Sequence, residues 1–207
     1  MELGVFSFNK DIPLWLKIVY SLFLCILVPF YWHEYGMTNF LWFSDVTLIG
    51  IGFILWCYNR LISNVLMLWF LPLALAWNID FLGRIFSGHN FLGITNYMFD
   101  STIPIFVRGF SLFHLWLPVL LMWLFVKFGY DRRAWIAQLI PLWVLLLLTY
   151  LVTEPEKNIN WTYGPTAHPQ HWVSPIFYLL ILMLFLPFCI FLPLHIILKK
   201  VNHKLKH

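Results

Sequence analysis

Long apolar runs, separated by short polar segments, recur along the whole chain. A helix needs about 20 apolar residues to cross the ~30 Å hydrocarbon layer of a bilayer at 1.5 Å per residue. The runs that approach this length predict membrane-spanning helices over residues 13–31, 39–57, 62–82, 102–126, 134–152 and 174–198. We therefore expect an all-α bundle of six transmembrane helices that forms one domain over residues 1–207.

The composition agrees with a membrane protein. Hydrophobic residues make up 61% of the 207 residues, charged residues make up 11%, and the mean hydropathy is +0.80. A soluble domain carries about a quarter charged residues. The formal net charge is +4, and Lys199, Lys200, Lys204 and Lys206 follow the last predicted span. A basic tail in this place is typical of contact with the lipid bilayer and does not indicate nucleic acid as a partner.

Lysine and arginine are unequally distributed between the two ends of the predicted bundle. Arg84 and Lys157 lie at one end. The opposite, basic end holds Lys10, Arg60, Lys127, Arg132, Arg133 and the lysines of the tail. Positively charged flanks are retained in the cytoplasm, so we expect both termini to be cytoplasmic. Two long outer loops, 83–101 and 153–173, are rich in Gly, Asn, Tyr, Trp, His and Pro, which predicts structured loops packed on the bundle.

Polar and ionisable residues gather toward the outer ends of the predicted spans. They are Asp45, Asn78, Asp80, Arg108, Ser111, His114 and Glu154. A charged residue inside a membrane costs about 2.5–3.5 kcal/mol on insertion scales, so each needs a partner or a water-filled cavity. Arg108, Ser111 and His114 recur at intervals of three, which places them on one stripe of a helix. We expect these residues to line an outward-facing pocket, and the pattern assigns no catalytic residue.

Arg108 and Asp45 are expected at similar depth in the membrane. Each lies roughly 9 Å from the outer end of its predicted helix at 1.5 Å per residue. Opposite charges at equal depth should pair, because leaving either one alone in a low-dielectric interior is costly. Such a pair could be a structural ion pair that fixes the packing of two helices, or it could belong to a ligand pocket.

Two histidines and a carboxylate suggest a zinc site in the long outer loop 153–173. His168 and His171 are three residues apart, and Glu154 lies upstream of them. Imidazole and carboxylate groups suit zinc, and a catalytic zinc takes three protein ligands. The spacing alone is not specific, so hydrogen-bonding surface histidines are the alternative. In the same loop, Asn160-Trp-Thr162 matches the acceptor pattern for N-glycosylation.

Three outer segments resemble a family of uncharacterised bacterial polytopic integral membrane proteins, and the resemblance covers most of the chain. The segments are His33-Glu-Tyr-Gly-Met-Thr-Asn-Phe-Leu-Trp-Phe-Ser-Asp45, Tyr97-Met-Phe-Asp100 and Asn158-Ile-Asn-Trp-Thr-Tyr-Gly-Pro165. The resemblance implies a location in a bacterial inner membrane. It implies no activity and supplies no catalytic residue.

The polar outer end predicts a pocket that binds a small or lipid-like molecule at the membrane boundary. If the pocket also processes its ligand, His114 or a carboxylate would transfer a proton and Arg108 would hold an anionic group. A transporter or channel is the first alternative, although the ionisable residues crowd one side and form no path across the bilayer. A non-catalytic subunit of a membrane complex, whose outer loops dock a partner protein, is the second.

Overall fold

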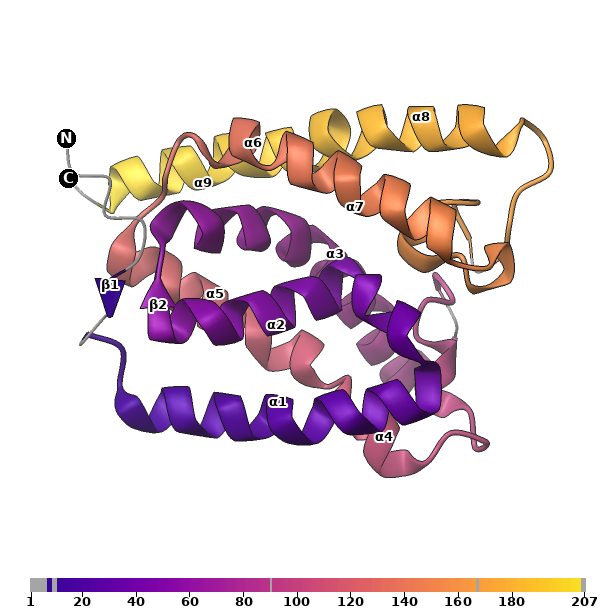
Figure 1. The fold of residues 1–207 in the computed structure, drawn as a ribbon, viewed down its shortest axis with the longest axis horizontal. Coiled ribbons are helices and arrows are strands. Elements are labelled where there is room, and N and C mark those ends of the chain that lie inside the picture. The colour runs from indigo at the N-terminus through magenta and orange to yellow at the C-terminus, as the bar shows by residue number, and fades with distance from the viewer. Residues whose placement is uncertain (1–6, 9–10, 90, 167, 206–207) are drawn as a thin grey trace.

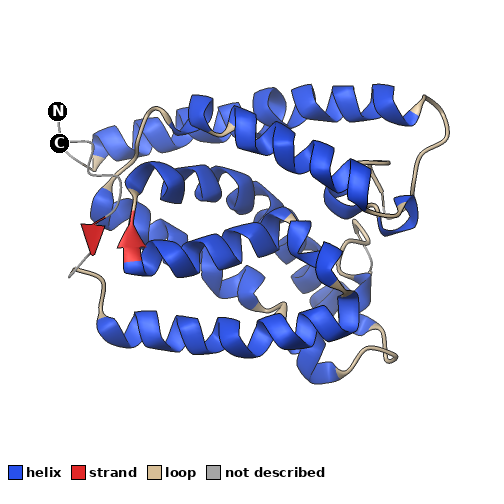
Figure 2. Cartoon of the chain, viewed as in Figure 1, coloured by secondary structure: helices blue, strands red, loops and turns tan. Residues whose placement is uncertain are grey.

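The computed structural model describes residues 7–8, 11–89, 91–166 and 168–205, and almost all of its regular structure is helical (Figure 2). Lys10 and Lys206, which the sequence assigns to the basic end, lie outside these residues. The α-helices are α1 (Leu14–Tyr35), α2 (Phe43–Trp56), α3 (Arg60–Ser87), α4 (Ile105–Phe110), α5 (Phe113–Phe128), α6 (Ala134–Ala137), α7 (Leu139–Val152), α8 (Pro175–Phe185) and α9 (Leu192–Lys204). The short elements are β1 (Ser7–Phe8), β2 (Cys57–Tyr58), the 3₁₀ turns η1 (Met37–Leu41), η2 (Asn96–Phe99), η3 (Pro155–Lys157) and η4 (Ile159–Trp161), and the π-helical turn η5 (Leu186–Phe191).

Five helical segments in the described part of the chain are long and apolar enough to cross a membrane. They are Leu14–Tyr35, Arg60–Ser87, Ile105–Phe128, Ala134–Val152 and Pro175–Lys204. The outer faces of these segments expose large apolar side chains such as Val119, Ile140 and Leu151. Contact with water would make such broad apolar surfaces unfavourable, whereas lipid tails solvate them. The structure is therefore a helical bundle whose apolar helices are compatible with a membrane protein.

The segment predicted as the second span is shorter than expected. Helix α2 has 14 residues and begins at Phe43, whereas the predicted span starts at residue 39. Gly36, with a φ of 81°, ends α1, and residues 37–41 form the turn η1. At 1.5 Å per residue α2 measures about 21 Å, less than the hydrocarbon thickness. Apolar composition alone could not separate the 3₁₀ turn from the helix that follows it.

The helices are arranged around α3, which packs against α2, α5, α6 and α9. Figure 1 shows α1 on one side of this centre and the α6–α9 segments on the other. β1, the start of α1 and the end of α9 lie at the same end of the bundle, where β1 pairs antiparallel with β2 (Figure 1). The loop from α3 to α4 and the loop from α7 to α8 lie at the opposite end. The two long loops therefore share one end of the molecule.

A proline in α5 creates a polar contact between two helices. Proline has no N–H, so a proline inside a helix leaves the carbonyl four residues earlier without its usual donor. Pro118 has this effect on the carbonyl of His114. The side-chain amide of Asn78, on α3, donates to that oxygen over 2.9 Å. Asn78 therefore holds α5 against α3, and it does so just below the outer end of the bundle.

A second proline has the same effect on α8. Pro187 removes the donor for the carbonyl of Met183, and the indole N–H of Trp143 on α7 donates to this oxygen over 2.8 Å. The helix continues from Leu186 through the π-helical turn η5. In both cases a bond lost within one helix is replaced by a bond between two helices.

We expect Asn78→Leu to destabilise the fold by about 1–3 kcal/mol, because the buried His114 carbonyl loses its donor. In a Pro118→Ala background the cost should shrink, because the substituted residue has an N–H that can donate to that carbonyl. The Oδ1 atom of Asn78 is buried and has no partner among the described residues. Its removal should therefore change the free energy of unfolding equally in the two backgrounds. Unfolding in mixed detergent micelles measures all four free energies. Equal costs of Asn78→Leu in the two backgrounds would contradict this role.

Candidate functional site

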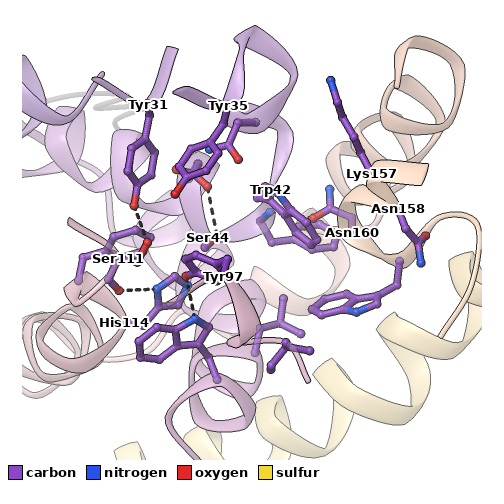
Figure 3. A pocket seen from close by; sticks show the side chains of 18 of the residues that line it. Tyr31, Tyr35, Trp42, Ser44, Tyr97, Ser111, His114, Lys157, Asn158 and Asn160 are labelled. Atoms are coloured by element: carbon purple, nitrogen blue, oxygen red, sulfur yellow. Dashed lines mark hydrogen bonds between the residues drawn. The ribbon is translucent and has the colours of Figure 1, made fainter. Parts of the chain in front are cut away.

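A cavity of about 350 Å³ lies between the two long loops and the ends of the helices beside them (Figure 3). This volume is at the lower end of the roughly 300–1,000 Å³ that is common for ligand pockets. The polar side chains that line it belong to Tyr31, Tyr35, Asn39, Ser44, Asp45, Tyr97, Ser111, His114, Lys157, Asn158, Asn160 and Thr166. Its other large side chains are those of Trp42, Phe43, Trp77, Phe113 and Trp161.

One buried side chain, that of Asn160, ties the loop between α7 and α8 to the bundle. Its Oδ1 accepts the backbone N–H of Phe43 over 2.9 Å, and its Nδ2 donates to the carbonyl of Leu41 over 2.7 Å. Nδ2 also lies 3.4 Å from the hydroxyl of Thr149 on α7. The first N–H groups of a helix have no partner within the helix, so Asn160 satisfies one at the start of α2. Asn160 is fully buried, so the N-glycosylation interpretation of this site is wrong.

A second asparagine shapes the same loop from within. The side-chain amide of Asn158 donates to the carbonyls of Gly164 and Thr166 over 2.9 and 2.8 Å, and its Oδ1 accepts the N–H of Tyr163 over 2.8 Å. Asn158 and Trp161 adopt positive φ angles of 40° and 58°. Asparagine tolerates this left-handed region better than most residues do. These bonds fold the loop back so that Trp161 and Thr166 line the cavity.

The loop between α3 and α4 is held in its conformation by Asp80. Its carboxylate accepts the N–H groups of Leu92 at 2.6 Å, Gly93 at 3.2 Å and Thr95 at 2.9 Å. The hydroxyl of Thr95 donates to it over 2.7 Å. Asp80 is fully buried and does not line the cavity, so its predicted place in the pocket is wrong. It acts instead as an anchor that brings Gly93 and Tyr97 to the cavity wall.

Asp45 lines the cavity as a carboxylate without a cationic partner. The residue is 4% exposed, and its Oδ2 accepts only a long bond, of 3.3 Å, from the hydroxyl of Ser44. Its Oδ1 is buried and has no hydrogen-bonding partner among the described residues. Asp45 lies in the first turn of α2, where the helix dipole stabilises a negative charge. Most of its hydrogen-bonding capacity is nevertheless unused.

The predicted ion pair between Arg108 and Asp45 does not form. The Nη1 of Arg108 donates to the carbonyl of Met98 over 2.8 Å, and neither ion pair found among the described residues includes Arg108. Its Nε is buried without a partner, and Arg108 lies outside the cavity lining. The prediction assumed equal depth in two long helices. In the structure α2 begins at Phe43, so Asp45 lies in its first turn.

His114 and Ser111 reach the cavity, as predicted, but through a break in the helix. Backbone bonds join Ser111 to Arg108 and His114 to Ser111 at i→i−3 spacing, between α4 and α5. The Nδ1 of His114 lies 2.8 Å from the carbonyl of Ser111. A carbonyl only accepts, so Nδ1 is the donor and Nε2 is the acceptor of a neutral ring. The imidazole also stacks on Trp77, with centroids 4.6 Å apart.

Hydroxyl groups form a second polar cluster beside His114. The hydroxyls of Ser111 and Tyr31 share a hydrogen bond of 2.6 Å, and the indole N–H of Trp77 donates to the hydroxyl of Tyr97 over 3.0 Å (Figure 3). Burial raises the pKa of Tyr97 well above its ordinary value, so this phenol stays protonated. The Ser111 hydroxyl bonds a tyrosine, and only its backbone carbonyl bonds the imidazole. This differs from a nucleophile paired with a general base.

The predicted zinc ligands do not come together. Glu154 forms an ion pair of 3.4 Å with Lys157, and both side chains are largely exposed. His168 and His171 are exposed on the loop surface. No group of three His, Cys, Asp or Glu side chains in the described ranges is placed to hold a metal ion. Glu154 also lies outside the cavity lining, so its predicted place in the pocket is wrong.

No protein-family model, curated protein or solved structure matches this chain, so its function has to be argued from the site itself. Of the predicted pocket residues, Asp45, Ser111 and His114 line the cavity, while Asn78 supports the backbone of His114. The tyrosines and tryptophans of the cavity were not among the predicted pocket residues. One signal was present: segments 33–45, 97–100 and 158–165 all contribute to the lining.

We expect Asn160→Ala to destabilise the protein by about 1–3 kcal/mol, because the N–H of Phe43 and the carbonyl of Leu41 lose their partner. Hydrogen exchange should rise across residues 154–172 and at the amide of Phe43. Asn39→Ala is the matched control, because Asn39 is another asparagine of the cavity wall. Mass spectrometry of exchange in detergent measures both. Unchanged protection of residues 154–172 in Asn160→Ala would refute the anchoring role.

Proposed function

We propose that this protein is a six-span membrane protein whose outer cavity binds a small ligand at the membrane boundary. The observation that carries the proposal is the cavity itself, because 350 Å³ of space lies between helix ends and two loops that buried polar side chains hold in place. Loops that only connect helices do not need such anchors. Polar groups with unused hydrogen-bonding capacity face this space, which is typical of a binding site.

The proposed orientation places the cavity on the non-cytoplasmic side. Arg60, Lys127, Arg132 and Arg133 belong to the end of the bundle that also holds β1 and the start of α1, and the tail lysines follow α9. The cavity end holds Arg84 and Lys157. Basic residues are retained in the cytoplasm, which supports cytoplasmic termini and six crossings with α2 as the short one. We further propose a bacterial inner membrane as the setting, in line with the resemblance of the outer segments.

The geometry favours binding over transport. A transport path needs polar groups that continue from one side of the bundle to the other. Below the cavity, Gln138 accepts the indole N–H of Trp69 over 2.9 Å, and both are buried among leucines of the core. This bond joins α3 to the start of α7 within the apolar core, which supports a binding pocket over a polar path.

Thiol labelling tests the orientation and the cavity together. In a background without the native cysteines, an impermeant neutral maleimide added outside should label Thr166→Cys and, more slowly, Ser44→Cys. It should miss Arg132→Cys and Lys204→Cys, because those positions face the cytoplasm. Labelling of the last two from outside would reverse the orientation. An inert Ser44→Cys beside a reactive Thr166→Cys would mean that the cavity is closed to solutes and would remove the proposed function.

A further inference from the structure

The cavity lining carries one carboxylate, that of Asp45, and one ammonium group, that of Lys157. Asp45 contributes a carboxylate whose Oδ1 has no partner among the described residues. Lys157 pairs with Glu154 and not with Asp45, and the Nη1 of Arg108 donates to the Met98 carbonyl outside the lining. A buried carboxylate needs a counter-charge or hydrogen-bond donors. The cavity therefore has a place for one positive group beside Asp45.

The walls around this carboxylate are aromatic. Tyr35 comes from the end of α1, Trp42 from the turn before α2 and Tyr97 from η2, and Figure 3 shows these side chains gathered in the cavity. An aromatic ring carries negative charge on its faces, so it attracts a cation that lies within about 6 Å of its centroid. Trp77 uses one face for His114. Aromatic rings that share a cavity with a carboxylate are the kind of groups that recognise substituted ammonium groups.

Other ligand classes fit this chemistry less well. An anion would bring its charge beside Asp45 and would meet the negative faces of the rings. A neutral apolar ligand would fill the space but would leave Oδ1 without a partner. A hydrated metal ion would find one carboxylate where such ions take several oxygen ligands. An organic cation satisfies the carboxylate and the rings at the same time.

We propose that the cavity binds an organic ammonium cation, with Asp45 as its counter-charge and Tyr35, Trp42 and Tyr97 as its aromatic cage. This inference rests on the proposed function, because it names the ligand class of the same outward-facing cavity. The cation is either a free small molecule or the headgroup of a lipid that reaches the cavity from the membrane. Both sources present the same substituted ammonium group.

Equilibrium binding of radiolabelled choline to the full chain tests the proposal. The protein is placed in nanodiscs of phosphatidylglycerol, whose headgroup has no ammonium group. We expect saturable binding that tetramethylammonium displaces. The matched competitor 3,3-dimethylbutan-1-ol has choline's shape with carbon in place of the charged nitrogen, and it should compete at least tenfold less well. Equal competition by the neutral alcohol, or no saturable binding of choline, would overturn the proposal.

Variants assign the binding to this cavity. Asp45→Asn should weaken choline binding at least tenfold, because it removes the counter-charge and keeps the shape. Glu154→Gln, which neutralises a carboxylate outside the cavity, should stay within twofold of the parent. Trp42→Leu should weaken binding more than Trp42→Phe, which keeps an aromatic face. Unchanged binding in Asp45→Asn would overturn the assignment.

A second measurement keeps the proposal testable if Asp45→Asn does not fold. Ser44→Cys, beside Asp45, is labelled with a cationic and an anionic methanethiosulfonate of similar size. The cationic reagent should react at least tenfold faster, relative to the ratio for Thr166→Cys on the loop. Equal relative rates would overturn the proposal.

The two sources of the cation are separated by changing the lipid. Reduced choline binding in phosphatidylcholine nanodiscs assigns the lipid headgroup as occupant, and unchanged binding assigns a free cation. Both results support an ammonium site. A cavity that the neutral maleimide reaches but choline does not occupy refutes the cation and leaves the proposed function standing. A cavity that the maleimide does not reach refutes the proposed function first.

Discussion

The hydrogen bonds of Asn160 are the contact on which the outer end of the molecule depends. They join a loop after α7 to the first N–H of α2, 117 residues away in the chain. Because this N–H is satisfied from outside, α2 can begin at Phe43 below the ends of its neighbours. Because α1 is followed by the turn η1 and α2 begins only at Phe43, space is left beside the first turn of α2. The cavity occupies this room, with Asp45 in the first turn beneath it.

The remaining walls follow the same principle, in which one buried polar side chain satisfies several backbone groups. Asp80 holds the loop between α3 and α4, and Asn158 folds the loop between α7 and α8. Asn78 supplies the donor that Pro118 lacks. Each of these groups would be costly if left unpaired in a membrane protein, where water cannot replace a lost partner. Of the buried polar atoms that have no partner among the described residues, the Asp45 Oδ1 and the Tyr35 hydroxyl belong to residues that line the cavity, and this underlies our assignment.

The sequence was sufficient for the helices and insufficient for the loops. Apolar runs located the five helical segments that are long enough to cross a membrane and the shorter α2, and their composition indicated a membrane protein. Asp45, Ser111 and His114 were predicted at the cavity because polar residues in apolar runs need a partner or a cavity. Arg108 and Asp80 were misplaced because their partners are backbone groups of irregular loops, which hydrophobic periodicity does not reveal. The role of Asn160 depends on a contact between distant segments, so no local pattern could predict it.

The most direct test of the cation cavity is a crystal of the protein soaked with tetramethylarsonium, in which arsenic replaces the nitrogen of tetramethylammonium. Its anomalous signal locates the cation without reference to side-chain density. We expect one strong anomalous peak inside the cavity, beside the Asp45 carboxylate and within about 6 Å of the ring centroids of Tyr35, Trp42 or Tyr97. A cavity without an anomalous peak, in crystals whose solvent reaches it, would contradict the account.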